Sequence, residues 1–258
     1  MIATLIANPH ISSHSHSLVS SKTPSIVLRR GTLSDLDSIL EIGLNAMPLD
    51  PQWDYRFPFR RVFSHDQRDA TRKRYQEFLE NAEQWSVSIA EIVDNHDAIP
   101  IAFAIWDIAN LTGYNSQLTR VPALQPKKHT RRDANPKRMQ AWTRILREAK
   151  VYYFERQYGS QQIQLQILAT HPMFQRLGAG SRLVDEGIRL AKMSNNAISV
   201  FASPMGRRLY SKLGFKSIAS VVVQVKDDPE FVSVEAMTYE PELPVLGPVK
   251  NQRARDLT

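Results

Sequence analysis

Hydrophobic and polar residues follow two different periods along this chain of 258 residues. Alternation at every second residue is typical of strands, whereas apolar residues that recur about every 3.6 residues indicate a helix with one buried face. The helical period predicts helices within 32–44, 65–84, 139–158 and 180–192. Strands are predicted at 26–31, 85–92, 99–108, 163–170, 197–202, 217–225 and 231–239. This succession predicts an α/β (α+β) fold in which helices flank a mixed sheet.

The stretch from Ile163 to Leu190 combines a strand, a turn and a helix. His171 and Pro172 end the strand, because proline has no N–H group to donate to a neighbouring strand. The glycine-containing turn that follows leads directly into a helix, whose first N–H groups and dipole favour an anion such as phosphate. The pattern lacks the glycine spacing of a dinucleotide fingerprint and the lysine of a P-loop. By itself it is also compatible with a tight turn that binds nothing.

Two motifs in this region make the anion-binding interpretation more specific. The run from Gln175 to Gly180 (QRLGAG) resembles the Q/R-x-x-G-x-G/A signature of the GNAT (GCN-related N-acetyltransferase) superfamily. The run from Leu209 to Phe215 (LYSKLGF) resembles the later L/F-Y-x-x-x-G-F segment of the same family. The resemblance is strong over about residues 162–225 and rests on pattern alone over 26–111. It implies a mostly antiparallel mixed sheet that is splayed at the cofactor strand.

The resemblance also implies an activity, namely transfer of an acetyl group from acetyl-CoA (coenzyme A) to a primary amine of a small molecule. The amine would attack directly in a ternary complex, with no metal. Tyr210 matches the tyrosine that protonates the CoA thiolate, and a phenol with a reference pKa of about 10 keeps its proton at neutral pH. A purely structural role for Tyr210 remains open. The implied cofactor-binding residues are Leu168, Ala169, Thr170, Gln175, Arg176, Leu177, Gly178, Ala179, Gly180, Ser181 and Ser203.

The segment from Met47 to Phe63 is the predicted acceptor loop. Its prolines favour an extended and stiff backbone, and its aromatic side chains need a surface to contact. We predict that Trp53 and Phe57, together with Trp106 from a central strand, bind the substrate. The alternative is that these rings cover the core.

The general base is the least defined part of the predicted site. Some members of the family use a glutamate on the central strand, but the candidates here, Gln164 and Gln166, cannot accept a proton. Glu91, Asp107 and His171 are substitutes by position only. A water chain, or an amine that arrives deprotonated, would serve equally well. The sequence therefore assigns no base.

Composition and charge set the predicted domain organisation. A Ser- and His-rich N-terminal extension (1–24) and a C-terminal tail (241–258) flank a single domain (25–240), in which 109–161 form a basic, partly helical insertion. The insertion is either solvated surface or a contact for the 3′-phosphate of coenzyme A or for an acidic acceptor. The net charge of +7 suits an anionic partner, and coenzyme A qualifies.

Several other classes are excluded or disfavoured by the sequence. The chain has no cysteine, which excludes disulfides and thiolate sites. No apolar run approaches the roughly 20 residues of a membrane helix, so no membrane partner is expected. With no secretory signal, a cytoplasmic or nuclear location is predicted. A protein or peptide acetyltransferase and a non-catalytic acyl-CoA-binding or nucleic-acid-binding module stay as alternatives. The acceptor amine, the acyl chain length, the choice between monomer and homodimer, and a targeting role for 1–24 stay open.

Overall fold

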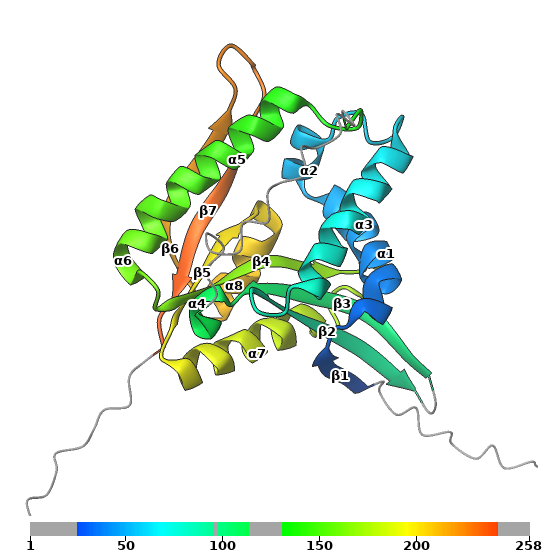
Figure 1. The fold of residues 1–258 in the computed structure, drawn as a ribbon, viewed down its shortest axis with the longest axis vertical. Helices are drawn as coiled ribbons and strands as arrows, with labels where there is room; N and C mark the ends of the chain where they lie inside the picture. The colour runs from blue at the N-terminus through cyan, green and yellow to red at the C-terminus, as the bar shows by residue number, and fades with distance from the viewer. Residues whose placement is uncertain (1–24, 95–96, 114–130, 242–258) are drawn as a thin grey trace, which may run out of the picture.

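A single sheet organises the computed structural model, which describes residues 25–94, 97–113 and 131–241 (Figure 1). The strand order is β1-β2-β3-β4-β5-β7-β6. Every neighbouring pair is antiparallel except β4 and β5, which run parallel. The strands are β1 (Ser25–Arg30), β2 (Trp85–Asp94), β3 (Asp97–Asp107), β4 (Gln162–Thr170), β5 (Ala197–Ala202), β6 (Lys216–Gln224) and β7 (Phe231–Tyr239). The predicted mixed, mostly antiparallel sheet is therefore confirmed.

Helices cover both faces of this sheet, as the alternation of β3 requires. Phe103 and Ile105 point to the face covered by α1 (Leu36–Ala46) and α3 (Ser64–Glu80). Ala102, Ala104 and Trp106 point to the opposite face, which is covered by α7 (Ala179–Ser194). Because successive side chains of a strand point to opposite faces, one strand supplies both halves of the core.

Trp106 is buried in the core beneath α7. Its side chain is 2% exposed, and a Cβ atom on Gly187 of α7 would lie 2.2 Å from its ring. The absence of a side chain at Gly187 is what lets α7 pack so closely against the indole ring. The prediction that Trp106 contacts the substrate is therefore corrected, because a ring enclosed between helix and sheet presents no surface to a ligand.

The basic insertion supplies a long helix at the end of the sheet farthest from β1. The helix α5 (Pro136–Lys150) is capped by Asn135 and continues into a π-helical turn (Val151–Glu155) and α6 (Arg156–Tyr158). Figure 1 shows α5 lying along β6 and β7. Apolar residues of this segment pack on β6 and β7, among them Trp142 and Phe154. The insertion therefore extends the core over the last two strands.

Short helices complete the connections between the larger elements. They are η1 (Leu33–Asp35), η2 (Met47–Leu49), α2 (Pro51–Arg56), α4 (Ala109–Thr112), η4 (Pro172–Phe174) and α8 (Pro204–Lys212). The predicted acceptor loop is thus partly helical, since Asp50 and Pro51 provide the N-cap and first residue of α2. Within 25–94, 97–113 and 131–241 no helix combines the length and apolar character needed to cross a bilayer. The predicted extension (1–24) and all but the first residue of the tail lie outside the described residues.

Candidate active site

The sheet opens between β4 and β5. The two strands pair only from Gln162 to Leu165, whereas β4 stays paired with β3 as far as Thr170. A bulge contributes to this opening, because Ile167 pairs with Ile105 and Leu165 with Trp106, which leaves Gln166 without a partner in the ladder. On the β5 side, the backbone of 166–170 therefore has no strand neighbour in the described sheet. A ligand with amide groups can pair with such an edge.

The loop from Gln175 to Gly180 lies beyond the open end of β4. Gly178 is the N-cap of α7 with a φ angle of +91°, and Arg176 has a φ of +68°. A Cβ atom on Gly178 would meet no atom within 4 Å, so open space adjoins the backbone there. The first N–H groups of α7 have no acceptor inside the helix, and the helix dipole adds positive potential. This geometry fits a phosphate group and matches the predicted cofactor loop.

Two contacts fix the position of this loop. The side-chain amide of Gln175 donates to the carbonyl oxygen of Thr170, 3.4 Å away, and so connects the loop to the end of β4. Arg182 on the first turn of α7 donates from Nη1 to the carbonyl oxygen of Ile26 on β1, at 2.6 Å. The helix N-terminus is thereby held against the sheet in the orientation that anion binding needs.

Tyr210 lies on α8, close to the place where β4 and β5 separate. Its side chain is 6% exposed and contacts the ring of Phe215, with 5.5 Å between the centroids. Within the described residues, its hydroxyl group has no hydrogen-bonding partner. Burial raises the pKa of Tyr210, and the negative charge of Asp50 adds to the effect. The phenol therefore keeps its proton at neutral pH and can act as an acid.

Ser203 has a structural role in the described residues. It is the N-cap of α8, and its hydroxyl oxygen accepts a hydrogen bond from the N–H group of Gly206 at 3.2 Å. Such a cap satisfies one of the free N–H groups of the helix. The hydroxyl hydrogen is still available to donate, so a contact with the cofactor stays a prediction.

The acceptor loop and the insertion contact one another through aromatic rings and an arginine. Trp53 and Phe57 of α2 contact each other, with 4.8 Å between ring centroids, and Phe57 is only 3% exposed. The guanidinium of Arg56 lies 4.4 Å from the ring centroid of Trp142 on α5 and 5.2 Å from that of Trp53. Burial lowers the pKa of Arg56 to about 10. The ring of Phe57 therefore mainly covers the core, while Trp53 is only partly buried.

The arginines of the insertion are engaged in ion pairs within the chain. Arg132 pairs with Asp66 of α3 at 2.7 Å, and Arg138 pairs with Asp228 and Glu230 beyond β6, each at 2.7 Å. Arg131 likewise pairs with Asp133. Arg132 and Arg138 therefore connect the insertion to the rest of the domain. The side chain of Arg132 is 61% exposed and lies on solvated surface, and a contact with the 3′-phosphate stays a prediction. Lys127 and Lys128 lie outside the described residues.

Each of the three substitute bases has a partner within the described residues. Glu91 pairs with Arg29 of β1, at 2.6 Å, on the side of the sheet away from β5. Asp107 accepts a hydrogen bond from the N–H of Ala109 and lies 3.6 Å from Lys150. His171 accepts one through Nδ1 from the N–H of Met173, at 3.4 Å. These contacts give each group a local structural role.

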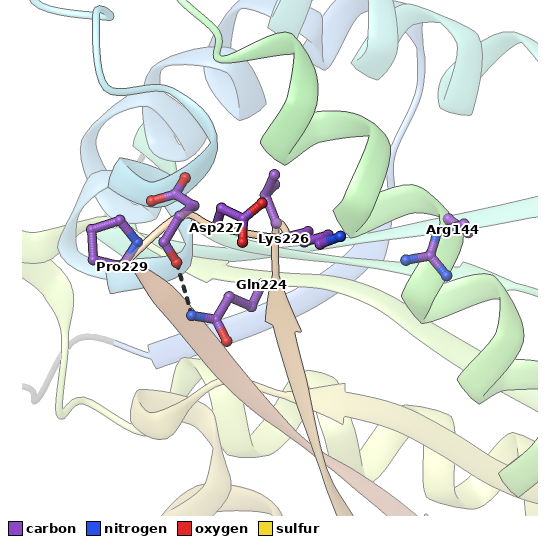
Figure 2. A pocket seen from close by; sticks show the side chains of 7 residues that line it. Arg144, Gln224, Lys226, Asp227 and Pro229 are labelled. Atoms are coloured by element: carbon purple, nitrogen blue, oxygen red, sulfur yellow. Dashed lines mark hydrogen bonds between the residues drawn. The ribbon is translucent and has the colours of Figure 1, made fainter.

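Two hollows lie on the same side of the molecule as α5. A groove of about 810 Å³ runs between the acceptor loop and the start of β7, and includes Pro48, Leu49 and Pro51. A pocket of about 590 Å³ lies beside α5 at the turn between β6 and β7, where the side chain of Gln224 donates to the carbonyl of Asp228 at 2.8 Å (Figure 2). Neither includes Tyr210 or the 175–180 loop in its lining. Only the groove adjoins the predicted acceptor loop.

Comparisons with known proteins agree with this geometry. Residues 151–233 match the family model described as an acetyltransferase (GNAT) domain. No curated protein matches the chain by sequence. A solved structure of a histone acetyltransferase and related acetyltransferase from Corynebacterium glutamicum is similar, with a TM-score of 0.53, 19% identity, and coverage of 86% of this chain and 99% of that one.

Two further solved structures have the same fold. A polyamine N-acetyltransferase from Drosophila melanogaster has a TM-score of 0.53 and 12% identity over 84% of this chain and 100% of that one. An agmatine N-acetyltransferase mutant in its apo form has a TM-score of 0.55 and 12% identity over 84% and 99%. The motifs, the opened sheet and the family match coincide on one region of the chain. Residues 151–233 therefore match the acetyltransferase (GNAT) domain, and the described chain has the fold of solved N-acetyltransferases.

Proposed function

We propose that this protein is an acetyl-CoA-dependent N-acetyltransferase that acts on a primary amine of a small molecule. One observation carries the proposal: β4 has no β5 partner beyond Leu165, and a Cβ atom on Gly180 of α7 would lie within 4 Å of Leu168 and Thr170 of β4 and of Leu209, the neighbour of Tyr210 on α8. The edge suits an amide-containing arm, the helix N-terminus a pyrophosphate, and the phenol a leaving thiolate. The names of two similar structures, a polyamine and an agmatine N-acetyltransferase, support a small amine as acceptor.

The main task of the protein in this reaction is to align the amine with the thioester. Acetyl-CoA, when bound, supplies an acetyl group already activated as a thioester. The amine nitrogen forms the new C–N bond as the C–S bond breaks, and loses a proton. The hydroxyl of Tyr210 donates its proton to the departing sulfur and regains one from solvent. The backbone of 166–170 and the N–H groups at the start of α7 hold the reactants in place, so that the reaction becomes effectively intramolecular.

The test of this proposal is thermal stability with and without acetyl-CoA. A ligand that binds only the folded protein stabilises it by about 2.7 kcal/mol at 100 times its dissociation constant, which corresponds to a rise in Tm of roughly 5–10 °C for a domain of this size. Gly178→Asp should abolish that rise, because a carboxylate at the N-terminus of α7 repels phosphate. The matched control is Gly113→Asp, which also has a positive φ of +70° and open space but lies away from the loop.

The outcomes separate binding from folding. If both variants lower the Tm of the free protein similarly and only Gly178→Asp loses the rise, the cofactor site is established. If wild-type protein shows no rise at millimolar acetyl-CoA, the proposed function is wrong. Turnover of a panel of primary amines, with polyamines, agmatine and a lysine-containing peptide, then identifies the acceptor class.

A further inference from the structure

Asp50 differs from the other buried carboxylates of the described structure. Asp35, Glu91 and Asp133 are each less than 9% exposed, and each makes a direct ion pair with an arginine at 2.6 Å. Asp50 is also buried, at 9% exposed, but no cationic side chain lies within 4.0 Å of it in the described residues. Burying a carboxylate without a cationic partner is costly. The charge of Arg56 acts on Asp50 without forming a direct ion pair, so the carboxylate can still bind a cation favourably.

The local backbone keeps this carboxylate in place. Asp50 is the N-cap of α2, and its Oδ1 accepts a hydrogen bond from the N–H of Gln52 at 3.2 Å. Pro48 and Pro51 restrict the backbone on both sides, because proline fixes its own φ angle. The capping bond uses one of about four lone-pair positions on the carboxylate. The remaining positions can accept hydrogen bonds from a ligand.

The position of Asp50 relative to the sheet connects it to Tyr210. Asp50 follows α1 and η2, whose Met47 packs on the face that includes Phe103. Tyr210 belongs to the core of the opposite face, with α7. The two side chains interact electrostatically, since the charge of Asp50 contributes to the raised pKa of Tyr210. Met47 packs in the same cluster as Ile167 and Ala169, which lie in the part of β4 that β5 leaves unpaired, so Asp50 follows a segment that adjoins the opening.

The surroundings of Asp50 also suit an organic amine. Pro48, Leu49 and Pro51, which flank it, contribute to the groove of about 810 Å³ beside the start of β7. The ring of Trp53 lies on the next turn, and its Nε1 is buried without a hydrogen-bonding partner in the described residues. The charge of Arg56 also acts on this region, but its guanidinium is held against the rings of Trp53 and Trp142. The groove also includes Asp54, Glu230, Arg60 and Arg61, so apolar and charged groups line it together. Apolar surface close to a carboxylate suits an alkylammonium group.

We propose that Asp50 binds the ammonium group of the acceptor and accepts the proton that the nitrogen must lose before it attacks. This inference rests on the proposed function and adds to it the substrate class: amines that are cationic at neutral pH. One N–H proton passes to the Asp50 carboxylate and then to solvent. The free lone pair forms the C–N bond, the C–S bond breaks, and Tyr210 protonates the sulfur. The nitrogen then loses its second proton to solvent, and Tyr210 regains a proton from solvent. The net products are the amide, the thiol and one proton released to solvent.

The variant Asp50→Asn removes the negative charge of the side chain but keeps its role as the N-cap of α2. Asparagine caps helices about as well as aspartate, so α2 and the stability of the protein should be preserved. Asp50→Ser, another good cap without charge, is the second variant. Asp37→Asn is the control, because it removes an exposed carboxylate that is paired with Arg72 and lies outside the groove. All three should retain the wild-type rise in Tm with acetyl-CoA.

Turnover measurements then compare two classes of acceptor. A primary alkylamine, with a pKa near that of lysine at about 10, arrives as the ammonium ion, whereas an arylamine arrives neutral. We expect Asp50→Asn and Asp50→Ser to lower kcat/KM for the alkylamine about 10²-fold and to leave that for the arylamine unchanged. Asp37→Asn should change neither. Equal losses for both acceptors, or none for the alkylamine, would overturn the role of Asp50.

A binding measurement tests the role of Asp50 independently of whether the protein acetylates amines. Butylammonium is titrated by calorimetry into wild-type protein and into Asp50→Asn, with and without saturating CoA. Binding by wild type that Asp50→Asn loses supports the ammonium site even if no acetylation is found. If the Tm rises with acetyl-CoA but wild type binds no butylammonium, the cofactor proposal stands and the Asp50 proposal fails.

Discussion

The two sides of the proposed site are constructed in different ways. The cofactor side consists of one continuous stretch, from β4 through α7 and β5 to α8, and its geometry comes from short-range features such as the positive φ of Gly178. The acceptor side combines three segments that are far apart in the sequence, namely 47–57, the insertion and the β6–β7 turn. A site made from contiguous chain is visible as a motif, whereas one made from distant segments is visible only after folding.

The physical interactions differ as well. Backbone N–H groups and a strand edge form the cofactor side, so almost any side chain that avoids blocking them is acceptable. On the acceptor side, cation–π contacts and ion pairs attach the insertion to the loop, as with Arg56 and Trp142. Substitutions should therefore separate the two sides: changes in the first should affect chemistry or cofactor binding, and changes in the second should affect amine binding and stability.

The largest effect is expected for Tyr210→Phe on the cofactor side. Loss of the general acid should lower kcat about 10²- to 10⁴-fold, with the rise in Tm caused by acetyl-CoA retained. Because burial raises the pKa of Tyr210, the wild-type enzyme should keep its activity up to pH values above about 10 before this phenol ionises. Tyr239→Phe is the control, since that ring contacts Phe215 from the other side. A Tyr210→Phe variant with wild-type kcat would exclude the acid role.

A medium effect is expected for Arg138→Met, which disconnects the insertion from the β6–β7 turn. Loss of hydrogen bonds from this half-enclosed guanidinium should lower the free energy of unfolding by about 1–2 kcal/mol. The amine KM should rise while acetyl-CoA binding is unchanged. Arg144→Met, an exposed position of the same helix, should have little effect on either quantity. Urea denaturation and steady-state kinetics provide the two measurements.

The ion pair between Arg138 and Asp228 should also make the stability of the protein depend on pH, in a direction that can be predicted. The hydrogen bonds from Arg138 hold the pKa of Asp228 below its usual range. A lowered pKa means that this stabilisation is complete above the pKa of an unfolded aspartate, about 3.9, and is lost as the pH falls through the lower folded value. The stability difference between wild type and Arg138→Met should thus shrink in acid. A difference that stays constant from neutral pH into that range would show that the ion pair is not its source.

The smallest effect is expected for Trp142→Leu on the insertion. The ring faces the guanidinium of Arg56, and such contacts contribute about 0.5–2 kcal/mol, so the amine KM should rise about 2- to 30-fold through displacement of α2. Trp142→Phe retains an aromatic face and should restore most of the lost affinity. Acetyl-CoA binding should be the same in both variants. If instead both variants change acetyl-CoA binding as much as amine KM, the two sides are coupled and the division between them is wrong.

Parts of this division could be predicted from the sequence. The glycine-containing turn before α7 and the segment around Tyr210 were identified by local motifs, and the family match on 151–233 supports that identification. The strands followed from alternation. Trp106 was misplaced, because a strand pattern shows which residues share a face but not which face a helix will cover. Asp50 was missed, although its position before Pro51 is typical of a helix N-cap; a cap and an isolated buried charge have the same sequence pattern.

What the sequence by itself determined is the local geometry: periods that select strand or helix, a glycine that permits a positive φ, and a turn that directs free N–H groups outward. Only the tertiary structure decided which charged side chains form ion pairs. Arg132 and Arg138 pair with Asp66, Asp228 and Glu230, whereas Asp50 is buried and makes no ion pair within the described part of the chain. The physical reason is that charge interactions depend on distance in space and on burial, and neither is specified by neighbours along the chain.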